Sequence, residues 1–452
     1  MAKKKENPGI PHTRALKLAD VYDCFESRPL DAGNFEKYYV DVDKGRGLTP
    51  LKKMKRLFEK NPGGSYKFLF AGYKGCGKST ELNRLQKELQ DDFIVLNFSV
   101  RQELDILNIS YIELFIALMK RLFQFVSEEK KIEIPKQYIE NITSWVKSKE
   151  IEEINDKYLG IGIDTGAEAK SGIPFFANFF AKFTASAKAS SSLKETLRKT
   201  VEPKLSELIL NCNLLINEIK LQIEKIGKKG LIVIVEDMDK VDLSKGEDIF
   251  YIHSAQLTQL NCHTIFTFPI ALKYYIRFTA IKNNYTDSFD LPMIRVKNRD
   301  GSPFEEGRNL MKEIVEQRMD DDLFDEAGII DEMIDSSGGC LFDLFRMIRD
   351  AADNALDFDR EKITGEDFQA AYLYLKSDYE NTIAENKAEG ILVDAYYKVL
   401  VECATDPNKK PGQSKELLDL RNNLTVLGYN GENWSDVHPV VRDILKERGM
   451  LK

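Results

Sequence analysis

The chain has 452 residues, of which 43% are hydrophobic and 31% charged, and its formal net charge is -8. This composition is typical of a globular protein of several domains and excludes disorder, collagen or coiled coil as a description of the whole chain. The negative charge does not favour electrostatic attraction of the whole protein to nucleic acid or to an anionic membrane. Six cysteines without paired spacing and only four histidines indicate reduced thiols and no zinc site. Since we find no signal-peptide pattern and no apolar run of about 18 residues, we expect a cytoplasmic protein.

The first half of the chain predicts strands that alternate with helices. Apolar runs predict strands at 38–42, 66–71 and 93–98, and polar residues predict a turn at 43–47. Apolar residues at helical spacing predict helices at 79–89 and 108–127. Residues 159–192 are rich in Gly, Ala, Ser and Phe, which indicates an insertion. A stripe of phenylalanines at helical spacing lies inside it: Phe175, Phe176, Phe179, Phe180 and Phe183. We expect this stripe either to pack against the rest of the protein or to form a self-association or partner surface.

The second half continues the alternation and then becomes helical. The predicted elements are a helix at 205–226, strands at 231–235, 263–268 and 289–296, and helices throughout 305–375. The tail, 391–452, predicts helix, loop, helix, strand (425–429), turn (430–433), strand (434–438) and helix, an order that suggests a small winged-helix domain. Strands that are continuous apolar runs between helices favour a parallel sheet covered on both faces.

A glycine-rich segment connects the strand at 66–71 to the helix at 79–89. Its sequence, Gly72-Tyr73-Lys74-Gly75-Cys76-Gly77-Lys78-Ser79, fits the phosphate-binding pattern G-x-x-x-x-G-K-[ST], and Thr80 follows it. Glycines let main-chain N–H groups crowd around phosphate oxygens, and the helix N-terminus adds partial positive charge. Lys78 would reach the β- and γ-phosphates, and the Ser79 hydroxyl would ligate Mg²⁺. The segment therefore predicts a P-loop that binds ATP or ADP with magnesium.

A second motif follows the strand at 231–235. Glu236 and Asp237 stand where open α/β sheets bind their ligands, at the carboxyl end of a buried strand. We expect Glu236 to hold the metal through water and Asp237 to polarise the attacking water, although the two could exchange roles. Thr267, at the end of the next strand, either orients the γ-phosphate or lytic water or is a strand residue with a satisfied hydroxyl. No guanine-reading motif occurs, so adenine is the expected base.

These motifs resemble those of the P-loop ATPases of the additional-strand division, to which the AAA+ and STAND families belong. The resemblance implies an α/β fold: a doubly wound parallel-sheet P-loop NTPase domain followed by a helical lid domain and a small winged-helix domain. The expected parts are an N-terminal segment (1–50), the ATPase domain (51–300, with the insertion at about 159–192), the lid (301–385) and the winged-helix-like domain (386–452).

Two later stretches extend the resemblance. The stretch 337–346 is similar to the lid turn and helix that carry a second-sensor arginine; Phe342 stands in the expected arginine position, and Arg346 is the substitute one turn later. The stretch 437–443 resembles the Met-His-Asp segment of STAND switches, so His438 would contact the phosphates of ADP, although Pro439 replaces the aspartate. An alternative interpretation of His438 is a histidine packed near Trp434 with a ring nitrogen on a main-chain carbonyl.

The resemblance implies a slowly hydrolysing, ATP-binding switch that controls assembly with itself or with an effector protein. In bacteria such stand-alone ATPases accompany effectors in anti-phage defence, which is the biological context we expect. The chain stops at the winged helix without a ligand-sensing repeat array, which suggests a partner protein. One alternative is a DNA-associated AAA+ ATPase of the origin-loading or transposition-regulator kind, which the balance of basic and acidic residues in 386–452 does not favour. A second alternative is a scaffold that keeps nucleotide without hydrolysing it.

Overall fold

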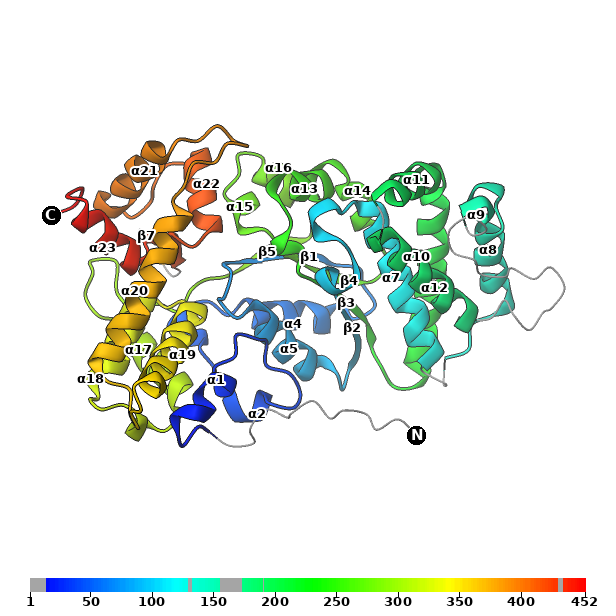
Figure 1. Ribbon diagram of the computed structural model, residues 1–452. Helices are drawn as coiled ribbons and strands as arrows, with labels where there is room; N and C mark the ends of the chain where they lie inside the picture. Colours follow the sequence, from blue (N-terminus) through cyan, green and yellow to red (C-terminus); the bar gives the residue numbers. More distant parts are fainter. Residues whose placement is uncertain (1–13, 129–131, 155–172, 190, 430–433) are drawn as a thin grey trace. The chain divides into compact units, whose positions relative to one another are not determined.

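The structure is a computed structural model that describes residues 14–128, 132–154, 173–189, 191–429 and 434–452 (Figure 1). Residues 159–172 of the predicted insertion and the predicted turn at 430–433 lie outside the described residues. The chain forms two compact units. The first unit contains Met1–Pro50, Gly72–Asn83 and Asp290–Lys452, and the second contains Leu51–Ala71 and Arg84–Phe289.

A five-stranded sheet, of strand order β2-β3-β4-β1-β5, lies in the second unit except for its residues Gly72, Asp290 and Leu291. Its strands are β1 (Lys67–Gly72), β2 (Phe93–Ser99), β3 (Gly230–Glu236), β4 (His263–Phe268) and β5 (Asp287–Leu291). The pairs β2–β3, β3–β4 and β4–β1 are parallel. Every residue of β1, β3 and β4 is buried, as continuous apolar runs predict for a sheet covered on both faces.

Helices connect and cover these strands, which gives the chain the α/β fold of a P-loop NTPase. In the second unit α7 (Tyr111–Glu128) packs against β2, and α12 (Leu205–Lys225) packs against β3 (Figure 1). The other helices of this part are α4 (Pro50–Lys60), α6 (Val100–Glu103), α8 (Lys136–Val146), α9 (Lys149–Ile154), α10 (Ile173–Ala189), α11 (Ser191–Val201), α13 (Leu243–Glu247), α14 (Ser254–Thr258), α15 (Ile270–Lys273) and α16 (Phe278–Asn283). Between β1 and β2 the chain forms α5 (Lys78–Leu89).

The phenylalanine stripe of the insertion is internal packing. Helix α10 lies against α7, and the Phe123 ring of α7 lies 5.2 Å from the Phe176 ring and 5.7 Å from the Phe180 ring between centroids. Phe176, Phe179, Phe180 and Phe183 are all buried. Of the two interpretations of the stripe, the structure therefore supports packing, because these four rings are already covered within their own unit.

Helices predominate among the described residues of the first unit, which also include one antiparallel pair of strands. Its N-terminal helices are α1 (Val21–Cys24), α2 (Phe35–Tyr38) and α3 (Asp43–Arg46), and its C-terminal helices are α17 (Glu305–Glu316), α18 (Gly328–Ser337), α19 (Leu341–Asp357), α20 (Gly365–Thr382), α21 (Val393–Thr405), α22 (Lys415–Asn422) and α23 (Pro439–Glu447). The antiparallel pair β6 (Val426–Tyr429) and β7 (Trp434–Val437) stands between α22 and α23. This is the order of elements that the sequence predicts for the tail.

Two predicted strands are wrong in whole or in part. In 38–42 the side chains alternate between buried and more exposed positions, as expected for an extended segment, but Tyr38 ends α2 and no described strand pairs with the segment. The turn predicted at 43–47 contains the one-turn helix α3, which Gly47 ends with a φ of 71°. The strand predicted at 289–296 is β5, and it ends at Leu291 because Pro292, which follows, has no N–H for a ladder.

Two whole-chain expectations concern membranes and thiols. Within the described ranges, no helix has both the length and the apolar character needed to cross a membrane. All six cysteines lie in these ranges, are buried and form no disulfide, as their unpaired spacing suggests.

Candidate functional site

The glycine-rich segment forms a tight loop between β1 and α5. Gly75 and Gly77 have φ values of 74° and 92°, a conformation that residues with a Cβ rarely adopt. The loop closes on itself through the Cys76 N–H, which donates to the Tyr73 carbonyl at 3.3 Å. Helix α5 then begins at Lys78, so its first N–H groups border the loop. The segment therefore has the strand–loop–helix form that phosphate binding requires.

Lys78 lies back across this loop. Its side chain is only 7% exposed, and its Nζ donates to the carbonyls of Gly72 and Tyr73, each at 2.9 Å. These acceptors are neutral carbonyls, so a phosphate oxygen would be a stronger partner for the ammonium group. The Lys78 ammonium thus lies at the loop, and its contact with phosphate stays a prediction.

The first turn of α5 also holds the N-terminal segment of the first unit. Leu30 N donates to Thr80 Oγ1 at 3.2 Å, and Asn83 Nδ2 donates to the Leu30 carbonyl at 2.8 Å. Thr80 is a predicted nucleotide-binding residue, and in this structure its hydroxyl fixes the backbone of residue 30. Ser79, the predicted magnesium ligand, is half-buried beside it.

The turn before α19 lies against the P-loop, within the same unit. A Cβ on Gly75 would stand 2.4 Å from the Cβ of Phe342, and Lys74 Nζ lies 5.5 Å from the centroid of the Phe342 ring. This close approach depends on the turn itself: Gly339 has a φ of 85°, and a Cβ there would lie 1.8 Å from the Ile294 carbonyl oxygen. The turn before α19 therefore lies at the loop, with Phe342 as the residue that meets it, and its role as a lid turn stays a prediction.

Arg346, the predicted sensor arginine, is engaged elsewhere in the first unit. It forms ion pairs with Asp378 of α20 at 2.5 Å and with Asp350 of its own helix at 3.5 Å. In this structure it thus joins α19 to α20, and its contact with nucleotide stays a prediction.

An arginine that sequence reasoning missed lies beside the loop. Arg46, the last residue of α3, is 2% exposed, and its Nη2 donates to the Cys76 carbonyl at 2.6 Å. Its Nη1 donates to the carbonyl of Pro292, just after β5. The sequence carries a weak signal for the end of α3, since Gly47 is a C-cap glycine, but no local signal connects residue 46 to residue 76.

The acidic pair lies in the second unit, at the end of β3. Glu236 is 9% exposed, and its Oε1 accepts a hydrogen bond from Asn97 Nδ2 at 2.5 Å. Asp237 adopts a left-handed conformation with a φ of 67°, which turns the chain sharply after the strand. Its Oδ2 accepts from the Ser99 hydroxyl, and its Oδ1 lies 2.5 Å from Lys240 Nζ. The two neighbouring carboxylates are therefore held by different side chains.

Thr267 supports the turn that carries Asp237. Its buried Oγ1 accepts from the Met238 N–H at 2.9 Å and donates to the Val235 carbonyl at 3.4 Å. This matches the interpretation of a strand threonine with a satisfied hydroxyl. Since β3 and β4 are parallel, their carboxyl ends, which carry the acidic pair and Thr267, lie at the same edge of the sheet.

His438 caps the last helix of the first unit and is completely buried. Its Nδ1 accepts from the Val440 N–H at 3.3 Å, and its Nε2 lies 3.2 Å from Asp343 Oδ2. Tyr379 stacks on its ring and donates to the same carboxylate oxygen at 2.7 Å. Burial alone would raise the pKa of Asp343, but the contacts with His438 and Tyr379 outweigh it and lower that pKa. The alternative neighbour, Trp434, stacks on Tyr429 instead.

No cluster of three or more His, Cys, Asp or Glu side chains able to hold a metal occurs in the part of the chain that the structure describes. A P-loop metal site does not need one, because a hydroxyl, a carboxylate and the nucleotide's phosphates supply its oxygen ligands. The Ser79 hydroxyl and the Glu236 carboxylate are oxygen donors of the kind that Mg²⁺ prefers, so the donor set fits the expected ion.

Comparison with known proteins gives distant structural similarity only. No protein-family model matches the chain, and no curated protein matches it. Among solved structures it is similar to a Walker-type ATPase of Pyrococcus abyssi (12% identity over 94% of this chain and 99% of that one, TM-score 0.41). It is also similar to the ORC2 protein of Aeropyrum pernix (12% identity over 93% of this chain and 99% of that one, TM-score 0.39). A third similar structure is the Drosophila ORC bound to DNA (9% identity over 100% of this chain and 84% of that one, TM-score 0.41). Such distant similarity identifies no family, so the P-loop NTPase fold rests on this chain's own strand order and loop.

Proposed function

We propose that this protein is an ATP-binding, slowly hydrolysing switch whose nucleotide state controls its assembly with itself or with an effector protein. The observation that carries the proposal is the loop at the end of β1: two glycines with positive φ, a helix N-terminus, and the Lys78 Nζ, which lies across the loop and donates to the carbonyls of Gly72 and Tyr73. This arrangement suits the phosphates of ATP or ADP.

Magnesium and hydrolysis extend the proposal. Ser79 and Glu236 would hold Mg²⁺, which when bound would neutralise phosphate charge. Asp237 would accept the proton of the attacking water. In the structure both of its oxygens are already engaged, by Ser99 and by Lys240. That engagement supports slow turnover, because the carboxylate would have to release one of these partners before it could contact the attacking water.

The switch itself would work through the turn before α19. Phe342 lies against Gly75, so a nucleotide that reshapes the loop would move this turn. Arg346 and His438 would read the nucleotide only after exchanging their present carboxylate partners, Asp378 and Asp343, for phosphate. An effector in anti-phage defence is the context we propose for the assembly step.

Replacing Lys78 by Ala tests the central assignment. Each charge-assisted hydrogen bond contributes about 1.5–3 kcal/mol, so we expect at least about a tenfold loss of ATP affinity in titration calorimetry. Lys87→Ala, at the exposed end of the same helix, is the matched control and should bind ATP as the wild type does. An unchanged dissociation constant for Lys78→Ala would refute the proposal.

The acidic pair separates a hydrolysing switch from a nucleotide-bound scaffold. Asp237→Asn should keep ATP bound and abolish turnover, whereas Glu236→Gln should first weaken magnesium-dependent binding. The reverse pattern would exchange the two roles. Turnover equal to that of the wild type in both variants would refute both assigned roles, and no turnover in the wild type would leave the scaffold as the explanation.

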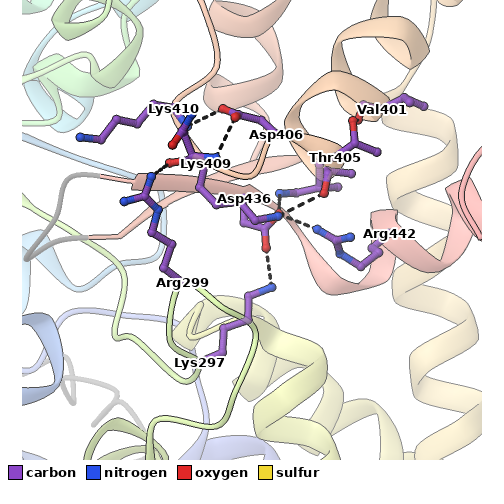
Figure 2. A network of polar contacts seen from close by, with 12 residues as sticks. Lys297, Arg299, Val401, Thr405, Asp406, Lys409, Lys410, Asp436 and Arg442 are labelled. Atoms are coloured by element: carbon purple, nitrogen blue, oxygen red, sulfur yellow. Dashed lines mark hydrogen bonds and ion pairs between the residues drawn. The ribbon is translucent and has the colours of Figure 1, made fainter.

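A DNA-associated ATPase is the second candidate, and one cluster of cations favours it. Lys297, Lys409 and Arg442 surround the single carboxylate of Asp436, and Arg299 and Lys410 lie nearby (Figure 2). Phosphate contacts by such a cluster would make DNA binding fall steeply with salt concentration. Binding of a DNA duplex with a steep salt slope, lost in the double variant Arg299→Ala/Lys410→Ala, would support this candidate; absence of binding at low salt would remove it.

A further inference from the structure

Arg46 is an unusual residue to find almost fully buried. Arginine is seldom inside a protein unless it is paired, yet only 2% of Arg46 is exposed. Its acceptors are two main-chain carbonyls, those of Cys76 in the P-loop and Pro292 after β5. Its Nε is buried without a hydrogen-bond partner, and across the described residues no carboxylate forms an ion pair with it. Within the described residues, the hydrogen bonds of this buried guanidinium thus go to neutral carbonyls and not to a carboxylate.

The position of that charge relates to the loop in two ways. A Cβ on Gly77 would lie 3.4 Å from Arg46 Nη2, so the guanidinium lies directly beside the residue before Lys78. In a trans peptide the C=O and the following N–H point in opposite directions. Because the Cys76 carbonyl points to Arg46, the Gly77 N–H points away from Arg46.

We propose that Arg46 is a positioning residue of the phosphate-binding loop. By holding the Cys76 carbonyl, it turns the Gly77 N–H toward the side where an anion binds, before any nucleotide arrives. Its positive charge, which lies beside Gly77, also favours an anion at the loop, since opposite charges attract strongly where water is excluded. The inference rests on the proposed function, because it assumes that phosphate binds at this loop.

The first unit contains a matched control. Arg318 is 5% exposed and also donates to two main-chain carbonyls, those of Tyr38 and Ile314. Its guanidinium lies 4.9 Å from the ring centroids of both Tyr38 and Phe345, and burial lowers its pKa to about 10. It has the same chemistry as Arg46 but contacts no residue of the P-loop. Removing it therefore measures what the loss of a buried arginine does to the fold alone.

The test compares ATP affinity with stability in the full chain. Arg46→Met and Arg46→Gln should each weaken ATP binding at least about tenfold, the size expected for losing one charge-assisted contact, with folding verified by circular dichroism at the titration temperature. Arg46→Lys, which keeps the charge but not the two-armed fork, should recover part of the affinity. Arg318→Met should lower the melting temperature and leave the ATP dissociation constant unchanged.

The outcomes separate this inference from the proposed function. If any folded neutral variant of Arg46 binds ATP as the wild type does, the positioning role is refuted; Arg46→Gln decides if Arg46→Met does not fold. If Arg318→Met weakens ATP binding as much as Arg46→Met, the effect belongs to the fold and the role is again refuted. If the wild type does not bind ATP, or Lys78→Ala binds it unchanged, the proposed function fails instead.

Discussion

Arg46 beside the P-loop and Asp436 in the β6–β7 hairpin are both charged groups buried in the first unit, with exposed fractions of 2% and 4%. Arg46 is held by neutral carbonyls. Asp436 is surrounded by cations: Lys297 Nζ at 2.8 Å, Lys409 Nζ at 3.0 Å and Arg442 Nη2 at 2.6 Å (Figure 2). Burial alone would raise the pKa of Asp436, but these cations outweigh it and lower that pKa.

This difference between the partners of Arg46 and Asp436 suggests which residues control ligand affinity and which control the free energy of unfolding. A buried charge that is fully compensated holds elements together: Asp436 joins its strand β7 to α23 and to the segments that carry Lys297 and Lys409. A buried charge without an ion-pair partner is costly for the fold, and at Arg46 we propose that bound phosphate supplies the opposite charge. By this argument the hairpin cluster should control unfolding, and the surroundings of the P-loop should control ligand affinity.

Asp436→Ala should have the largest effect on stability. It leaves three partly buried cations without their carboxylate, and breaking a buried pair of this kind costs about 3 kcal/mol or more. We expect this loss in the free energy of unfolding by urea denaturation, with ATP affinity of the folded protein unchanged. Glu389→Ala, which removes a pair with Lys415 whose side chains are 52% and 72% exposed, should change neither quantity measurably. If Asp436→Ala has the same free energy of unfolding as the wild type, the cations around Asp436 do not control unfolding.

Gly75→Ala should show the opposite pattern. Its φ of 74° and the nearby Phe342 Cβ mean that a methyl group strains the loop by about 1–3 kcal/mol. The loop should relax by changing shape, so ATP affinity should fall more than the melting temperature. Adding Phe342→Ala removes the clash but not the backbone strain, and should restore part of the binding. A double variant no better than Gly75→Ala would mean that Phe342 is irrelevant to the loop.

The smallest expected effect concerns Asp343 and pH. Its folded-state pKa lies below the ordinary value because His438 and Tyr379 hold the carboxylate. A lowered folded pKa means that this contribution is fully present above about pH 4 and is lost as the pH falls through the folded pKa. Asp343→Asn should therefore be less stable near neutral pH and show a weaker loss of stability in acid. An acid unfolding profile identical to that of the wild type would exclude Asp343 as a contributor.

The sequence predicts the central sheet well because local pattern and burial agree there. The predicted strand at 263–268 is β4 to the residue, and β1, β2 and β3 each differ from prediction by one residue at one or both ends. Such strands are apolar on both faces, so their hydrophobic runs are continuous and end where burial ends. The helix α12 is likewise found where its apolar periodicity places it.

The surroundings of the P-loop could not be predicted in the same way. The contact of Arg46 with Cys76 joins residues 30 positions apart, and that of Phe342 with Gly75 joins residues far more distant in the chain. Neither contact leaves a periodic signal, because each depends on how turns bring single residues together. The segment 38–42 shows the same point: its alternation is correct for an extended chain, but the absence of a neighbouring strand is a property of the tertiary fold.

The turn at Gly339 has a consequence for tracing this protein's relatives. At residue 339 any side chain would collide with the Ile294 carbonyl, and the φ of 85° is one that residues other than glycine rarely adopt. A homologue with the same architecture should retain glycine there, together with Gly75 and Gly77. This spaced set of glycines is therefore a sharper fingerprint for recognising the lineage than overall similarity.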